Sequence, residues 1–171
     1  MAQYDKSGFE SVYQSTSGTF ADNSTRQITE GDMRQFADDI ADSVLFISNT
    51  YDTIQFIIDG GGSVITSGVK GDILVPFNCQ IEGWDLVADI SGSITIDIWQ
   101  DTYANFPPTV ADTIVNTGTK PALSSAIKNT SSALTNWTTT LTKDKWLRFN
   151  AEGTISSVTR VTIALKVKRT A

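Results

Sequence analysis

Hydrophobic residues along this chain follow one period near its N-terminal end and another period through the remainder. From Thr29 to Ile47 they recur at helical spacing, whereas from Ile54 to Lys168 they alternate or cluster at strand spacing between Gly, Ser, Thr and Asn. A helix repeats one face about every 3.6 residues and a strand every second residue. The pattern therefore predicts one amphipathic helix followed by a β-rich region.

The expected helix begins at Thr29, whose side chain can cap the first turn, with Asp32 three residues later as a variant of the capping box. One apolar stripe runs along it, made of Met33, Phe36, Ile40, Val44 and Ile47. Its spacing also fits a short coiled-coil seam, although Ser43 occupies the strict heptad position. A helix of this length is marginal alone. We therefore expect the stripe to pack on the β region, on copies of the chain or on a larger assembly.

The β-rich region contains many short segments with apolar residues at every second position. These are Ile54–Ile58, Val64–Thr66, Asp72–Phe77, Ile81–Ala88, Ile94–Trp99, Trp146–Phe149 and Val161–Lys168. Many strands with one polar face and no helix between them predict a mainly β fold, either an antiparallel β-sandwich, here expected to be jelly-roll-like, or a small barrel. The stretch 102–136 is predicted to form long loops, one or two poor strands and a short helical turn near Ser124–Lys128.

Residues 1–28 are rich in Ser, Thr, Gln and Gly and have no hydrophobic period. Such a segment buries too little apolar surface to offset the entropy of ordering it. Four spaced aromatics, Tyr4, Phe9, Tyr13 and Phe20, favour an extended arm that orders on a partner. We thus expect three regions: the arm at 1–28, a helix with its linker at 29–52, and the sandwich at 53–171.

Composition and charge exclude several kinds of partner. Hydrophobic residues make up 40% and charged residues 19% of the 171 residues, as in ordinary folded proteins. Residues 1–60 hold ten acidic and three basic residues, a net charge of −7 within a total of −6, so no nucleic-acid groove is expected. We expect neither a signal peptide nor membrane insertion, because the start is polar and every apolar run is short.

The sequence contains no histidine, which excludes Ser-His-Asp and Cys-His catalysis and the usual zinc, iron and copper sites. The one cysteine, Cys79, lacks an activating base and is expected to be a buried small side chain. Two alternatives remain: a carboxylate pair of Asp97 and Asp101 for glycoside hydrolysis, and a calcium site that would add Asp112. We predict that the protein is not an enzyme and carries no cofactor.

One surface of the predicted sheet has the residue types that bind sugars. Asp97, Trp99, Tyr103 and Asn105 combine aromatic faces, which stack on the C–H bonds of a ring, with polar groups for its hydroxyls. We predict a receptor or glycan patch there. The alternative is that Trp99 is covered by the Phe106-Pro107-Pro108 loop or by a neighbouring subunit.

Several segments resemble a module of bacteriophage tail-fibre and minor virion proteins. The resemblance is carried by Phe56–Gly62, Thr66–Asp72, Val75–Trp84 and Asp97–Thr109, and by Thr19–Thr25, Ile28–Thr29 and Met33–Phe36, which look like the start of phage fibre proteins. It covers most of residues 19–168, and its motifs are structural rather than catalytic. It implies a bacteriophage source.

The resemblance implies a virion structural protein, a small tail or head fibre or receptor-binding-type appendage that acts by binding and assembly. We expect a homotrimer on the outside of the particle, made in the host cytoplasm and joined to other virion proteins by the arm. A bacterial surface glycan or protein is the expected receptor. The alternatives are a capsid or tail decoration protein that binds no receptor, and a carbohydrate-binding module.

Overall fold

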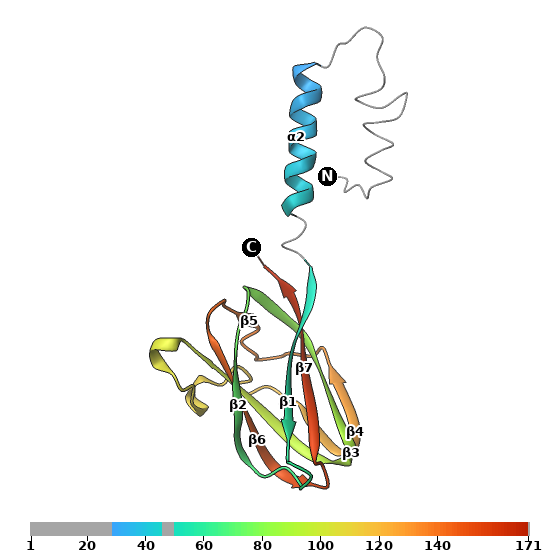
Figure 1. Cartoon of the computed structure of the whole chain (residues 1–171), viewed down its shortest axis with the longest axis vertical. Helices are drawn as coiled ribbons and strands as arrows, with labels where there is room; N and C mark the ends of the chain where they lie inside the picture. Colours follow the sequence, from blue (N-terminus) through green and yellow to red (C-terminus); the bar gives the residue numbers. More distant parts are fainter. Residues whose placement is uncertain (1–28, 46–49, 171) are drawn as a thin grey trace. The chain divides into compact units, whose positions relative to one another are not determined.

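The computed structural model describes residues 29–45 and 50–170, with the backbone alone for Glu30 and for 41–45. The chain divides into two compact units, Met1–Thr50 and Tyr51–Ala171, which are described separately below (Figure 1). The arm aromatics Tyr4, Phe9, Tyr13 and Phe20, and Ile47 of the expected stripe, lie outside the described residues.

The first unit contains the helix α2, Glu30–Leu45. Its N-terminus is closed by the capping box expected from the sequence. The Thr29 N–H donates to Asp32 Oδ2 at 2.8 Å, and the Asp32 N–H donates to Thr29 Oγ1 at 3.2 Å. These bonds satisfy two backbone donors that a helix start leaves free. The Thr29 hydroxyl also donates to Asp32 Oδ2 at 2.6 Å, and this bond, together with that from the Thr29 N–H, lowers the pKa of the Asp32 carboxyl.

The second unit is a seven-stranded antiparallel sheet, which confirms the mainly β fold. Its strands are β1 (Tyr51–Asp59), β2 (Gly68–Leu74), β3 (Cys79–Asp101), β4 (Ala122–Ser131), β5 (Thr140–Leu141), β6 (Trp146–Ser156) and β7 (Arg160–Arg169). Two short 3₁₀ turns, η3 (Tyr103–Asn105) and η4 (Val110–Asp112), lie between β3 and β4. The order along the sheet is β1-β7-β3-β6-β2, with β4 and β5 also paired to β3.

The 23-residue strand β3 turns this sheet into a sandwich-like body (Figure 1). Its first part, Cys79–Ala88, pairs with β7, and its second part, Ser93–Asp101, pairs with β6. Both layers therefore belong to one curled sheet. They meet across the core, where the rings of Phe56 on β1 and Phe149 on β6 stack with centroids 4.4 Å apart.

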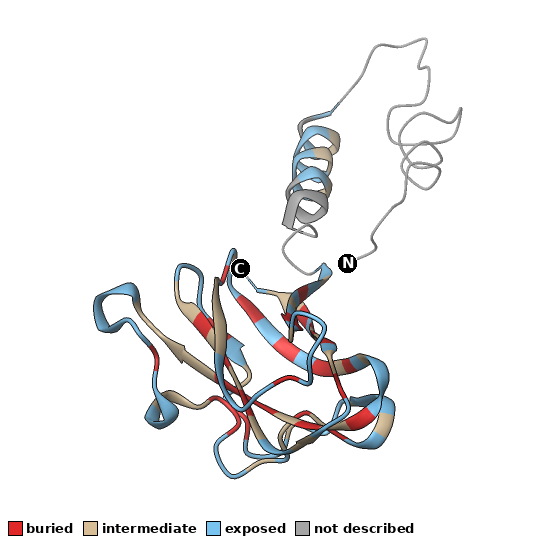
Figure 2. Cartoon of the chain, turned by 60° about the horizontal axis from the view of Figure 1, so that its bottom comes forward, coloured by how far each residue is buried: buried red, intermediate tan, exposed pale blue. Residues whose placement is uncertain are grey.

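The core follows the alternation seen in the sequence, and buried residues alternate with less buried ones along the strands (Figure 2). The buried members of the clearest strands are Ile81, Leu86, Ile94, Ile96, Ile98, Leu147, Phe149, Val161, Ile163, Leu165 and Val167. Cys79 is also fully buried, and burial raises the pKa of its thiol to about 11. A thiol with that pKa is inert at neutral pH.

Several local predictions were wrong. Val64–Thr66 is not a strand, and β2 covers Gly68–Leu74 rather than Asp72–Phe77. Ile81–Ala88 and Ile94–Trp99 are parts of one strand. The helical turn expected near Ser124–Lys128 is instead part of β4, a strand whose side chains are mostly exposed. Because β4 buries few side chains, it has little apolar alternation to reveal it, and its pairing with β3 determines its conformation.

Candidate recognition surface

The segment between β3 and β4, residues 102–121, is attached to the second part of β3 by backbone hydrogen bonds and by a buried carboxylate. Asp97 is fully buried. Its Oδ1 accepts hydrogen bonds from Thr113 Oγ1 at 2.7 Å and from the Ile98 N–H at 2.9 Å, and Lys120 Nζ lies 3.0 Å from its Oδ2. Lys120 also pairs with Glu152 on β6. One buried group thus joins β3 to Thr113, in the middle of this segment, and to Lys120, near its C-terminal end.

This geometry determines the charge of Asp97. Burial raises the pKa of the carboxyl, but the Thr113 hydroxyl and the Lys120 ammonium help to offset that effect, so the pKa lies below its usual value. The pKa of Lys120 is raised, because its two carboxylate partners outweigh its own burial. Both groups are therefore charged at neutral pH, as a paired buried carboxylate and ammonium should be.

The four residues of the predicted receptor patch do not share one exposed surface. Asp97 is buried, so its placement in the patch was wrong. Trp99 is half-buried, is bridged to Thr113 across the sheet, and has its indole N–H shielded from solvent. Tyr103 is 77% exposed, and Asn105 is also exposed. The structure thus separates a buried and a half-buried residue from an exposed pair. Trp99 is bridged to Thr113, whereas Phe106 of the predicted covering loop contacts Trp146 and Arg148 instead.

The exposed pair belongs to a loop that is attached to β6 and, through Arg148, to β2. Arg148 on β6 binds Asp72 on β2 through two bonds of 2.7 and 2.9 Å, and its third nitrogen donates to the Pro108 carbonyl at 3.4 Å. The same guanidinium lies 5.2 Å from the Phe106 ring centroid, and Phe106 makes an edge contact with Trp146 at 5.6 Å. The loop is thus held by an ion-paired guanidinium that contacts both an aromatic ring and a backbone carbonyl of the loop.

The two turns within the loop are also held by side chains. Asp101 Oδ1 accepts from the Thr102 N–H at 2.6 Å and from Asn105 Nδ2 at 3.2 Å. Thr109 and Asp112 form a second capping box at η4. Asp101 and Asp112 are thus engaged in different turns, and among the described residues no group of three Asp, Glu, Cys or His side chains could hold a metal ion.

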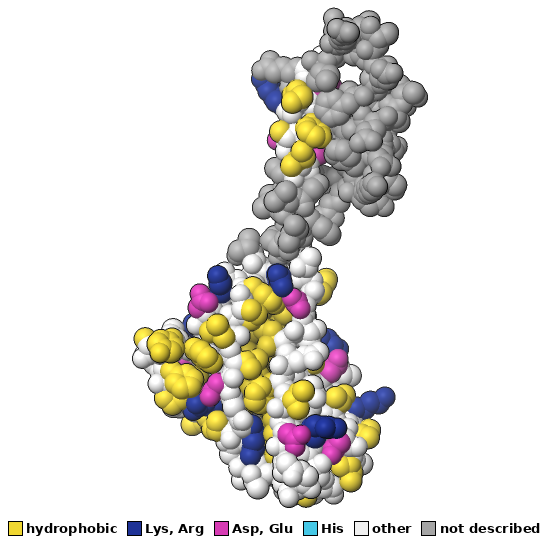
Figure 3. Space-filling model, viewed as in Figure 1, with side chains coloured by type: hydrophobic (Ala, Val, Ile, Leu, Met, Phe, Trp, Pro, Cys, Tyr) yellow, Lys and Arg dark blue, Asp and Glu magenta, His cyan; other side chains and the backbone are white. Residues whose placement is uncertain are grey.

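An apolar surface, here named the Phe106 patch, lies on and beside this loop. It consists of Tyr103, Phe106, Trp146 and Leu74. Leu74 is the cross-strand partner of Trp146, and Leu74 and Phe106 are 45% and 43% exposed. Hydrophobic side chains gather at this position over the projecting loop at the left of Figure 3. Phe106 and Leu74 were not predicted to belong to such a surface, because Phe106 was considered only as a residue covering Trp99 and Leu74 does not follow the strand alternation.

Replacing Trp99 by alanine is expected to lower the free energy of unfolding by about 2 kcal/mol, because a half-buried indole loses its packing. Thermal unfolding followed by circular dichroism measures this change. Tyr103→Ala serves as the exposed control and should shift the melting temperature by less than about 2 °C. Equal melting temperatures for the two variants would show that Trp99 is not a packing residue.

A second candidate surface is the apolar stripe of α2. Met33 and Ile40 are 52% and 43% exposed, whereas Phe36 is half-buried. Hydrophobic side chains form a line on the helix in Figure 3. Val44 lies in the helix, but its side chain is not described. The part of the stripe that is described thus presents substantial apolar area to its surroundings.

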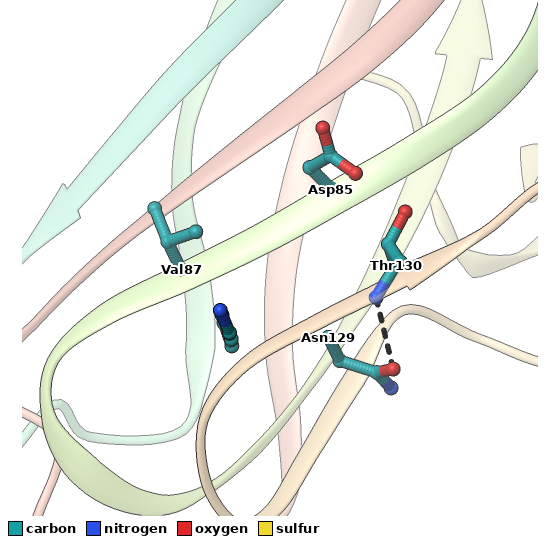
Figure 4. A pocket seen from close by; sticks show the side chains of 5 residues that line it. Asp85, Val87, Asn129 and Thr130 are labelled. Atoms are coloured by element: carbon teal, nitrogen blue, oxygen red, sulfur yellow. Dashed lines mark hydrogen bonds between the residues drawn. The ribbon is translucent and has the colours of Figure 1, made fainter.

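A pocket of about 490 Å³ lies on the outer side of β3 and β4 (Figure 4). Its lining consists of Asp85, Val87, Lys128, Asn129 and Thr130. Asp85 pairs with Lys166 at 2.8 Å, Thr130 Oγ1 donates to the Trp84 carbonyl, and Asn129 Nδ2 donates to the Ala122 carbonyl. Because Asp85, Asn129 and Thr130 are already bound to Lys166 or to the backbone, we assign no ligand to the pocket.

Comparisons with known proteins add little. No protein-family model and no curated protein matches the chain. Among solved structures, the complex of Aeromonas sobria serine protease (ASP) with the chaperone (ORF2) is similar over 78% of this chain and 30% of the matched chain. The sequence identity is 7% and the TM-score 0.31, too low to support a function. In the described part of the chain, no helix is long and apolar enough to span a membrane.

Proposed function

We propose that this protein is a bacteriophage virion component, a small fibre or receptor-binding-type appendage that acts by assembly and binding rather than by catalysis. The observation that carries the proposal is the capped helix α2 with Met33 and Ile40 exposed, which directly precedes an independent β unit. A short amphipathic helix requires a partner for its apolar face. Packing against two further copies would bury the stripe and give the homotrimer expected from the sequence.

In this proposal the regions have separate roles. Residues 1–28 join the particle through Tyr4, Phe9, Tyr13 and Phe20, the helix assembles the copies, and the β unit faces outward. Support for a binding role comes from the Phe106 patch, which is rigidly attached and exposed. Support against catalysis comes from the chemistry of the chain, which has no histidine and has a buried, inert Cys79.

The helix makes the proposal testable. We expect the wild-type protein to have three times the chain mass of 18.5 kDa in light scattering, and Phe36→Asp or Ile40→Asp to give monomers. A carboxylate introduced into a packed seam has no partner and disfavours assembly strongly. Gln35→Asp, at an exposed neighbouring position, is the matched control and should leave the mass unchanged.

If the wild-type protein is a monomer, or if both Phe36→Asp and Ile40→Asp leave its mass unchanged, the proposal that α2 forms a trimer is wrong. A cryo-EM map of virions then tests the location, since a fibre or appendage predicts trimeric density outside the particle. Adsorption of virions to cells separates a receptor-binding appendage from a decoration protein, because only the former loses adsorption when the outer surface is altered.

A further inference from the structure

The Phe106 patch combines exposed aromatic rings with a fixed backbone. Tyr103 is 77% and Phe106 43% exposed, yet the loop is held by Asp101, Arg148 and the η4 capping box. Exposed aromatic side chains on a rigid support lose little entropy when a ligand covers them. The exposed rings of the Phe106 patch are therefore suited to binding a ligand, and they do not serve to cover the core.

The size of the patch limits its occupant. Two aromatic rings, Leu74 and the edge of Trp146 together expose roughly 400 Å² or less, judged from the area of such side chains. A stable protein partner covers about 800 Å² on each side. The patch is too small to be a complete protein interface, and its area suits one or two ring-sized units of a ligand.

Polar groups border the apolar surface. Asn105 is exposed, and its amide has a carbonyl oxygen and a second N–H beyond the bond it donates to Asp101. Arg148 is only 16% exposed and is already bound to Asp72 and Pro108, so it supports the loop rather than offering donors to a ligand. Asp101 carries a carboxylate whose pKa is lowered, first by the Thr102 N–H, so it is ionised and accepts hydrogen bonds. A ligand with a flat apolar face and hydroxyls at its rim complements this combination.

We propose that the Phe106 patch binds a pyranose ring of a saccharide, with the ring's C–H face on Phe106 or Tyr103 and its hydroxyls directed to Asn105 and Asp101. This inference depends on the proposed function only for the bacterial origin of the saccharide. In place of Asp97, which is buried, and Trp99, which is half-buried and bridged to Thr113, the site takes Phe106, Trp146 and Leu74 as its apolar part.

Saturation-transfer NMR on the purified full chain tests the inference with a panel of free hexoses and N-acetylhexosamines. We expect saturation of ring C–H protons for at least one sugar, and weakening of its affinity by about tenfold in Phe106→Ala and in Tyr103→Ala. Tyr51→Ala is the matched control, because Tyr51 is 74% exposed on β1 and lies outside the patch. Its affinity should equal that of the wild type.

Three outcomes would overturn the inference: no saturation of any sugar in the panel, equal affinity in Phe106→Ala and Tyr51→Ala, or a change of oligomer mass in Phe106→Ala without sugar binding. The last outcome would identify the patch as a contact between protein chains. Because sugar binding is measured on the isolated protein and assembly by light scattering of the helix variants, the two proposals can fail separately. Thermal unfolding of each patch variant confirms that it is folded.

Discussion

Replacing Asp97 by alanine is expected to lower the free energy of unfolding by about 3–5 kcal/mol and the melting temperature by about 12 °C or more. The substitution leaves the Thr113 hydroxyl and the Ile98 N–H without their acceptor and deprives Lys120 of one of its two carboxylates. Removing one member of a buried ionic network is among the most destabilising single changes. Chemical denaturation followed by tryptophan fluorescence measures the effect.

Asp85→Ala is the matched control, because Asp85 also pairs with a lysine, Lys166, at 2.8 Å. Their side chains are 42% and 49% exposed, and a surface pair contributes about 1 kcal/mol at most. Asp97→Asn keeps an acceptor for Thr113 but loses the charge, so its stability should lie between those of the wild type and Asp97→Ala. Similar losses for the alanine variants of Asp85 and Asp97 would contradict the role assigned to burial.

Because of the Asp97 carboxylate, we expect the free energy of unfolding to decrease at acidic pH. The pKa of Asp97 is lower in the folded state than its ordinary value of 3.8. Its contribution to stability is therefore present above that pH and is lost as the pH falls through the folded-state pKa. Between pH 4 and pH 2 the wild type should lose more stability than Asp97→Ala, although other carboxyls with lowered pKa, such as Asp89, leave both proteins acid-sensitive.

Replacing Gly92 by alanine is expected to destabilise the β unit by about 3 kcal/mol. A Cβ at this buried position would meet the carbonyl oxygen of Ser156, and it would lie 2.7 Å from Val158 Cγ2 and 3.1 Å from the Val158 nitrogen. Because two of these three atoms belong to the backbone, a change of side-chain rotamer cannot relieve the contact. Gly92 lies where β3 passes from its β7 partner to its β6 partner, so the sheet cannot shift there without losing pairing.

Ser91→Ala is the control for this prediction, since Ser91 is the exposed neighbour of Gly92 on β3. Thermal unfolding of Ser91→Ala should match the wild type within about 2 °C, whereas Gly92→Ala should unfold about 10 °C lower. If Gly92→Ala melted with the wild type, the close approach of β3 to Ser156 and Val158 would not be a requirement of the fold.

The hydrophobic periodicity of the sequence predicted the strands whose side chains enter the core. Val161–Val167 and Ile94–Ile98 alternate because one side of each strand contacts the core, so the burial of these residues could be read from the sequence. The start of α2 was also predictable, because a capping box depends only on residues three positions apart, Thr29 and Asp32. Such features depend on neighbours in the chain, and the chain alone specifies them.

Contacts between residues far apart in the sequence decided the features that periodicity did not predict. Asp97 lies between Ile96 and Ile98 in the alternation and was therefore expected on an exposed face. Instead, Thr113 and Lys120, 16 and 23 positions along the chain, contact its carboxylate, and the charge of Lys120 compensates that of Asp97. The strand β4 and the Phe106 patch likewise depend on partners far away in sequence, β3 for the first and Arg148 for the second. Alternation reports which side of a strand a residue occupies, and only the tertiary structure decides what covers that side.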